Sequence, residues 1–181
     1  MLTSIGSLNV AAASLDVVVL GGGGHVGLPL SLALADSGLR VGIHDINQAT
    51  LDGIRAGTMP FREEGADDLL RRVLLTGRLA LSADPAMVGD ADIVIVVIGT
   101  PVDEFLGPSM TIFERAVDQI AGHLRDGALV ILRSTVYPGT TEYVSQALAE
   151  RGRRVDVAFC PERIADIEAA GSMPANVTAE G

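Results

Sequence analysis

Lysine and tryptophan are absent from this sequence, and cysteine occurs once, at Cys160. All 13 basic residues are therefore arginine, and against 23 acidic residues they leave a formal net charge of −10. A chain this acidic is repelled by nucleic acid and by anionic membranes, so we expect neither as a partner. A single cysteine excludes an intrachain disulfide and fits a reducing compartment, which favours a cytoplasmic protein.

Long apolar runs and aromatic residues are also scarce. No stretch reaches the roughly 18 apolar residues of a membrane helix, and residues 1–14 lack the basic segment that begins a signal peptide. Aromatic residues make up 3% of the chain, whereas apolar residues make up 48% and glycine occupies 21 positions. This balance is typical of aliphatic strands joined by many tight turns, and the length suits one domain.

Short β-branched runs alternate with helical patterns along the chain. We predict strands at 16–20, 39–45, 79–82, 92–98, 128–132 and 155–159, and helices at 26–35, 48–56, 66–76, 113–124 and 140–151. This alternation predicts the α/β class: a doubly wound (Rossmann) parallel sheet in a single three-layer αβα domain over residues 15–164. Residues 1–14 are expected to form a flexible N-terminal segment, and residues 165–181 a truncated connection or tail.

A glycine-rich turn follows the first predicted strand. Residues 22–27 (GGGHVG) match the pattern G-x-G-x-x-G, and this match lies between a strand and a helix, as a dinucleotide-binding loop does. Gly22 would take the tight turn, Gly24 would let the backbone approach a pyrophosphate, and Gly27 would let the helix lie close to the strand. The pyrophosphate would then lie at a helix N-terminus. We expect His25 to contribute its backbone N–H rather than its side chain.

Asp45 ends the second predicted strand, 23 residues after Gly22. This is the position of the carboxylate that accepts hydrogen bonds from the adenosine ribose in such folds. A carboxylate there repels a 2′-phosphate, so we expect NAD rather than NADP as the cofactor. The alternative is that Asp45 caps the helix that begins near Gln48.

Three later loops should meet at the same carboxyl edge of the sheet, where open α/β sheets bind ligands. Thr100 and Thr135 would supply hydroxyl groups, Glu162 would act as a base or hold water, and Arg163 would bind an anionic substrate. For each residue the alternative is turn chemistry or helix capping. Cys160 lies beside them and is expected to be a buried, inert thiol. We predict no metal site.

Six stretches together resemble the UDP-glucose/GDP-mannose dehydrogenase family, in the family's own order. They are GGGHVGLPLSLALA, HDINQATLDGIRAG, GRLALSAD, ADIVIVVIGTPVDE, GALVILRSTVYPGTTE and AFCPERI, and they run from about residue 16 to residue 164. Within this family they look most like the UDP-N-acetyl-D-mannosamine dehydrogenases. The resemblance implies an NAD-binding first domain of enzymes that oxidise the C6 alcohol of a nucleotide sugar to a carboxylate with two NAD.

The resemblance also implies roles for individual residues. It places NAD contacts at His25, Val26, Asp45, Thr100 and Thr135, in addition to the loop glycines. It places Thr135 and Glu162 at the catalytic centre, and Arg163 and Ile164 against the UDP-sugar substrate. The chain departs from the family at His25, where tyrosine is usual, and at Arg133, where an acidic residue or lysine is common.

Two catalytic groups of the family have no counterpart here. The family uses a thiol well beyond residue 181 and a lysine, whereas this chain contains no lysine and has its one cysteine at position 160. We therefore expect the chain to be inactive alone, as a part of a longer protein or a short relative that needs a partner. The resemblance implies a homodimer, but the helix through which the family pairs is not in this sequence, so the oligomeric state stays open. The alternatives are a non-catalytic NAD-binding module and the cofactor domain of a related β-hydroxyacid dehydrogenase.

Overall fold

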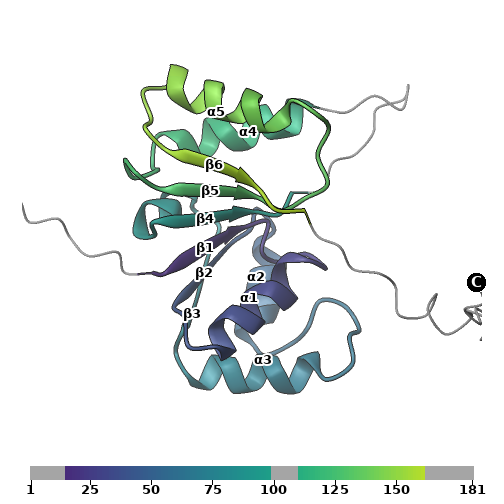
Figure 1. The fold of residues 1–181 in the computed structure, drawn as a ribbon. Coiled ribbons are helices and arrows are strands. Elements are labelled where there is room, and N and C mark those ends of the chain that lie inside the picture. The colour runs from purple at the N-terminus through teal and green to yellow at the C-terminus, as the bar shows by residue number, and fades with distance from the viewer. Residues whose placement is uncertain (1–14, 99–109, 162–181) are drawn as a thin grey trace, which may run out of the picture.

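A single parallel sheet organises the computed structural model, which describes residues 15–98 and 110–161 (Figure 1). The strands are β1 (Val17–Leu20), β2 (Val41–His44), β3 (Leu79–Ser82), β4 (Ile93–Val96), β5 (Leu129–Leu132) and β6 (Asp156–Phe159). The helices are α1 (Gly27–Asp36), α2 (Gln48–Arg55), α3 (Ala66–Leu75), α4 (Met110–Ala121) and α5 (Thr140–Glu150), with a short 3₁₀ helix, η1 (Pro85–Asp90). The strand order is β3-β2-β1-β4-β5-β6, and every pairing is parallel.

Alternate side chains of the strands point to opposite faces of the sheet, and each face has its own core. Val17 and Val19 of β1 belong to the cluster under α1, α2 and α3, whereas Val18 and Leu20 belong to the cluster under α4 and α5. A strand buried on both sides is therefore apolar at every position, which the sequence VVVL satisfies. The helices accordingly flank the sheet as two groups, α1–α3 and α4–α5 (Figure 1). The predicted doubly wound α/β fold is confirmed.

The chain reverses its direction of progress across the sheet between β1 and β4. From β1 it proceeds outward through β2 to β3, and it then returns to place β4 on the other side of β1. Helices on the two sides of such a point diverge, which opens a crevice beyond the carboxyl ends of β1 and β4. The fold thus fixes the place of a ligand site before any side chain is considered.

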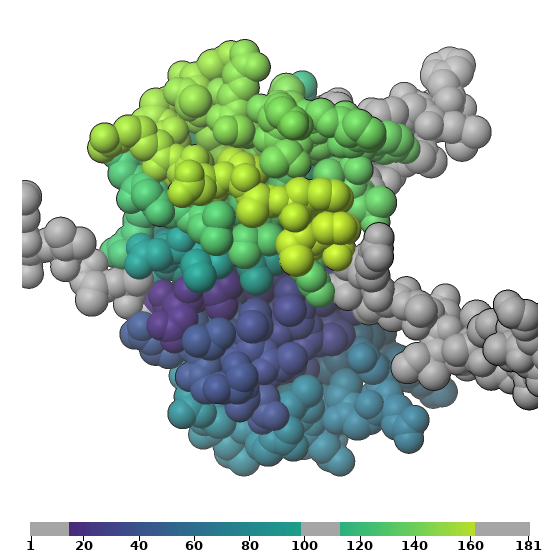
Figure 2. Space-filling view, in the orientation of Figure 1, coloured from purple at the N-terminus to yellow at the C-terminus, as the bar shows by residue number. Residues whose placement is uncertain are grey.

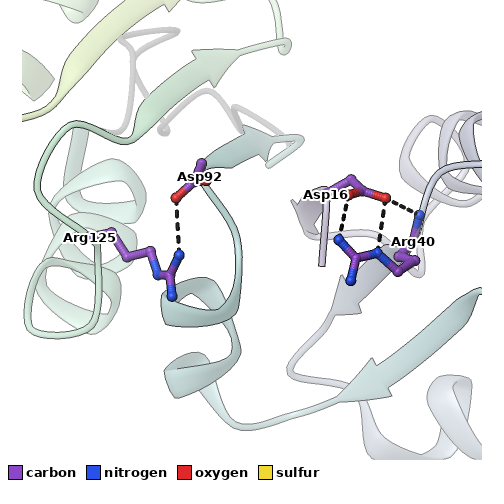
Figure 3. Close-up of polar contacts among 4 residues, drawn as sticks. All are labelled: Asp16, Arg40, Asp92 and Arg125. Carbon is purple, nitrogen blue, oxygen red and sulfur yellow. Dashed lines mark hydrogen bonds and ion pairs between the residues drawn. The ribbon is translucent and has the colours of Figure 1, made fainter. Parts of the chain in front are cut away.

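Ion pairs tie neighbouring strands together at the opposite, amino end of the sheet (Figure 3). Asp16 precedes β1 and Arg40 precedes the adjacent β2, and the Arg40 Nη2 atom lies 2.7 Å from Asp16 Oδ1. The Arg40 backbone N–H also donates to Asp16 Oδ2 at 2.7 Å. On the other half of the sheet, Arg125 Nη1 lies 3.2 Å from Asp92 Oδ1, just before β4. These contacts hold the end of the sheet that faces away from the crevice.

The predicted elements match the observed ones to within about three residues at each end, and η1 is the one described element that the sequence pattern did not predict. Its Pro85 and Gly89 obscured the helical pattern, although Asp84 caps it by accepting a hydrogen bond from the Ala86 N–H at 2.9 Å. The expected N-terminal segment and C-terminal tail lie outside the described residues. In the part of the chain that the structure describes, each helix is too short or too polar to cross a membrane.

Candidate functional site

The glycine loop between β1 and α1 is tightly folded, and its packing requires glycine at several positions, Gly22 and Gly27 among them. A Cβ atom on Gly27 would lie 2.5 Å from the Gly21 carbonyl oxygen, and one on Gly22 would lie 2.9 Å from the Val19 carbonyl oxygen. Gly24, by contrast, is exposed and has the Gly21 oxygen, at 3.7 Å, as its near neighbour. The loop therefore packs α1 against the strand while leaving an open face at Gly24, as a bound diphosphate requires.

Two backbone amides at the start of α1 have no acceptor within the described residues. The Leu28 N–H bonds back to the Gly24 carbonyl at 2.9 Å, but no side chain caps the helix, and the N–H groups of His25 and Val26 make no hydrogen bond there. Unpaired amides at a helix N-terminus attract anions, because the helix dipole adds to their partial positive charge. These amides fit a pyrophosphate.

Asp45 lies beside this loop, immediately after β2. Its Oδ2 atom accepts a hydrogen bond from the Gly23 N–H at 2.9 Å, and its Oδ1 atom accepts one from the Asn47 N–H at 2.9 Å. A Cβ on Gly23 would lie 2.8 Å from Oδ2, so glycine is what permits this approach. The side chain of Asn47, rather than that of Asp45, caps α2 by accepting from the Thr50 N–H. An ionised carboxylate has about four acceptor positions, so two stay available for hydroxyl groups.

A cavity of about 560 Å³ opens at this end of the sheet. Its lining comes from the carboxyl ends of β1, β2 and β4 and from one face of α4: Leu20, Gly21, Gly24, His44, Asp45, Ile46, Val97, Ile98, Arg115, Ala116 and Gln119. Its size is typical of small-molecule and cofactor sites, and its lining is mainly apolar with a few polar groups, as such sites are. The predicted cofactor residues Gly24 and Asp45 thus meet in one cavity.

His44 forms part of the cavity wall and was not predicted as a site residue. It is buried, at 3% exposure, and neither ring nitrogen makes a hydrogen bond of good geometry within the described residues. Burial lowers the pKa of His44, although the Ala83 backbone and the charges of Asp45 and Asp84 act in the opposite direction. The sequence did offer a signal for His44: it is the one polar residue of β2, whose other residues are Val, Gly and Ile.

The side chain of His25 has a partner that the sequence did not indicate. It stacks on Phe61, from the segment between α2 and α3, with ring centroids 4.1 Å apart and planes 26° from parallel. This contact joins the glycine loop to a segment 36 positions later in the chain. The stack uses the His25 side chain, and the His25 backbone N–H makes no hydrogen bond with the residues that the structure describes.

The other predicted site residues are less completely placed. Thr135 follows β5 and is exposed, but it is not among the residues that line the cavity. Thr100, Glu162, Arg163 and Ile164 lie outside the described residues. The roles predicted for these five residues stay predictions. The described residues that do meet, Gly24 and Asp45, belong to the part of the predicted site that would hold ADP-ribose. Within those residues, no group of three or more His, Cys, Asp and Glu side chains is placed to hold a metal ion.

The expectation that Cys160 is buried is wrong. Cys160 is exposed just after β6, at the sheet edge, where Phe159 is also 46% exposed. The Arg133 Nη1 atom donates a hydrogen bond to the Cys160 sulfur at 3.6 Å. The reason is visible in Figure 2: β6, in yellow-green to yellow, lies at the surface, and it is the edge strand of the sheet that the described residues form. An edge strand keeps an apolar pattern without full burial.

Comparison with known proteins identifies a family whose members resemble this chain over most of its length. The model of the UDP-glucose/GDP-mannose dehydrogenase family, NAD binding domain, matches residues 16–176. The chain is 35% identical over 164 residues to the UDP-N-acetyl-D-mannosamine dehydrogenase of Escherichia coli K12, covering 84% of this chain and 38% of that protein. It is 31% identical over 145 residues to the enzyme of the same name from Methanococcus aeolicus, covering 78% and 32%. The chain thus spans about a third of the length of these curated relatives.

Solved structures agree with this placement. The GDP-mannose dehydrogenase of Pseudomonas aeruginosa superposes with a TM-score of 0.78 at 27% identity, over 83% of this chain and 37% of that one. The UDP-D-ManNAc dehydrogenase of Pyrococcus horikoshii gives 0.77 at 31% identity, with the same coverage. The 3-hydroxyisobutyrate dehydrogenase of Mycobacterium tuberculosis gives 0.58 at 19% identity, over 87% of this chain and 43% of that one, a likeness of fold alone.

Proposed function

Because the chain belongs to the UDP-glucose/GDP-mannose dehydrogenase family, we propose that it is the cofactor-binding part of a nucleotide-sugar 6-dehydrogenase. The observation that carries the proposal is the pairing of two unbonded amides, at His25 and Val26, with a carboxylate at Asp45 that contacts the same loop. The relatives act on UDP-N-acetyl-D-mannosamine or GDP-mannose by their names. We infer a UDP-sugar as the substrate class of the whole enzyme.

The chain's residues would bind and orient the cofactor. The amides of His25 and Val26 would donate hydrogen bonds to the pyrophosphate, and Asp45 would accept them from the adenosine ribose hydroxyls. Bound NAD supplies the hydride acceptor, which an alcohol-to-carboxylate oxidation needs twice. The charge of Asp45 also opposes a 2′-phosphate, which sets the preference for NAD over NADP.

The substrate end of the site would lie at the ends of β4, β5 and β6. There Thr100 and Thr135 would hold the nicotinamide end of the cofactor, and Glu162 would orient or deprotonate a water molecule. Arg163 and Ile164 would contact the nucleotide sugar. These 181 residues contain no lysine, and their one thiol, at Cys160, belongs to the β6 edge. We therefore expect the chain alone to bind NAD without sustaining turnover.

Calorimetric titration with NAD and NADP tests the proposal. The wild-type chain should bind NAD more tightly than NADP. Replacing Asp45→Asn removes the charge that opposes the 2′-phosphate and the charge-assisted contact with the ribose, so the preference should fall by roughly 10- to 100-fold.

Asp68→Asn is the matched control, because Asp68 is exposed on α3 and does not line the cavity. It should leave both affinities unchanged, and thermal melting of each variant checks that it is folded. Equal binding of NAD and NADP by the wild-type chain would contradict the proposal.

A further inference from the structure

The cavity extends past Asp45 to residues that have no role in the pyrophosphate and ribose contacts proposed above. Ile46 follows Asp45 and is 81% exposed, yet it lines the cavity. From α4, Arg115 and Gln119 line the same cavity, with Ala116 between them. A single exposed isoleucine is ordinary on a protein surface. Ile46, however, lines a cavity next to the carboxylate proposed to bind the ribose, so its side chain can contact a bound ligand.

Arg115 lines the cavity and differs from the ion-paired arginines of this acidic chain. Arg40, Arg72 and Arg154, for example, are each paired with an aspartate. Arg115 makes no ion pair or hydrogen bond within residues 15–98 and 110–161, although the chain has 23 acidic residues. Its guanidinium group is thus available to a ligand in the cavity that it lines.

The order of the bonds in a dinucleotide determines which part of it can contact Ile46, Arg115 and Gln119. Its adenine is bonded to the ribose that Asp45 would hold, and its pyrophosphate lies on the other side of that ribose, toward the amides of α1. The base therefore extends away from the glycine loop, toward the part of the cavity lined by Ile46 and α4. A flat purine is stabilised when both of its faces are covered, and both an aliphatic side chain and a planar guanidinium can cover one.

We propose that Ile46 and Arg115 bind the adenine ring between them and that Gln119 recognises its edge. This inference rests on the NAD site proposed above and adds the residues that select the base. Positions 115 and 119 are four apart, so their side chains lie on one face of α4. The Gln119 carboxamide both donates and accepts, and it matches the amino group and the ring nitrogen that adenine presents side by side.

Arg115→Leu tests the stacking, because leucine keeps aliphatic volume while removing the planar cation. NAD affinity should fall by about tenfold, and the dependence of that affinity on salt should not change. A direct phosphate contact would behave differently, since the loss of that ion pair would make NAD affinity clearly less sensitive to salt, which gives a lower salt slope. Unchanged affinity, or a weakened affinity with a lowered salt slope, would overturn the assignment of Arg115.

Gln119→Leu tests the edge recognition with nicotinamide hypoxanthine dinucleotide, in which a carbonyl oxygen replaces the adenine amino group. The wild-type chain should bind NAD more tightly than this analogue, and Gln119→Leu should remove most of the difference. Arg115→Leu should lower the affinity for NAD and for the analogue by the same factor. Equal discrimination in the wild type and in Gln119→Leu would overturn the role of Gln119.

Arg78→Leu is the control for both tests. Arg78 is exposed before β3, at the amino end of the sheet, and its side chain makes no ion pair or hydrogen bond within the described part of the chain. It should bind both ligands as the wild type does. Absence of NAD binding by the wild-type chain would refute the proposed function together with this inference, whereas wild-type binding that Arg115→Leu does not weaken would refute the inference alone.

Discussion

His44 places a titratable group inside the sheet, one residue before Asp45, the carboxylate of the proposed cofactor site. Its imidazole faces the Ala83 backbone and feels the charges of Asp45 and Asp84, but burial outweighs them and lowers the pKa of His44. The folded protein therefore holds this side chain neutral at pH values where an unfolded chain would protonate it. Protonation of His44 thus favours unfolding.

Stability should consequently depend on pH in a definite direction. Above about pH 6.5, the ordinary pKa of histidine, both states are neutral and the contribution of His44 is fully present. Below it the unfolded chain binds the proton first, so stability falls by up to about 1.4 kcal/mol per pH unit until the folded pKa is reached. Urea denaturation at pH 8 and pH 5 should show that His44→Val loses less stability on acidification than the wild type.

His123→Gln is the matched control, because His123 is exposed after α4. It should lose as much stability between pH 8 and pH 5 as the wild type does. If His44→Val also behaves as the wild type, the buried imidazole is not the source of the pH dependence.

Glycine has opposite effects in two helices of this domain. Gly27 begins α1, where a Cβ would lie 2.5 Å from the Gly21 oxygen and 2.7 Å from the Gly22 Cα. Both contacts are backbone atoms, which cannot move without opening the loop. Gly53 is inside α2, where the near neighbour of a Cβ is the Thr58 oxygen at 3.9 Å, an ordinary contact.

Alanine at these two positions should therefore change stability with opposite signs. Gly27→Ala should destabilise the domain by about 1–3 kcal/mol, because it forces α1 away from the loop. Gly53→Ala should stabilise it by about 0.5–1 kcal/mol, because alanine loses less backbone entropy in a helix. Thermal or urea denaturation measures both, and a stabilising Gly27→Ala would show that the loop can relax.

Sequence patterns predicted the elements well where one physical preference dominates. The run VVVL is apolar at every position because β1 is central, and the turn glycines mark where α1 begins. The patterns failed where tertiary context decides. Nothing in AFC distinguishes an edge strand from a buried one, so Cys160 was misplaced. Likewise, Arg115 and Gln119 lack a motif, and only the packing of α4 brings them to the residues that follow β2.

The two ends of the sheet serve different purposes in the whole molecule. The amino end holds the ion pairs of Asp16 with Arg40 and of Asp92 with Arg125 (Figure 3), and the carboxyl end holds the cavity. The Arg40 side chain and backbone N–H both bond to Asp16 and lower the pKa of Asp16 to about 2. The stabilisation from this pair is therefore present above the ordinary pKa of aspartate and is lost as pH falls toward 2.

Asp16→Asn tests whether the amino end of the sheet contributes to stability without affecting cofactor binding at the carboxyl end. The variant should melt at a slightly lower temperature at neutral pH, since exposed pairs contribute little. The melting temperatures of the two proteins should converge as the pH falls toward 2. NAD affinity at neutral pH should not change, because Asp16 lies at the end of the strands away from the cavity. A clear change in NAD affinity would show that the ends are coupled.

The exposed sulfur at position 160 has a practical consequence. It is the sole thiol in the sequence, so a maleimide dye would attach at one place without any engineering. That place adjoins the rim where β6 ends, which is part of the proposed substrate end of the site. A fluorophore there would report, in solution and in real time, when another domain or protein settles over this rim.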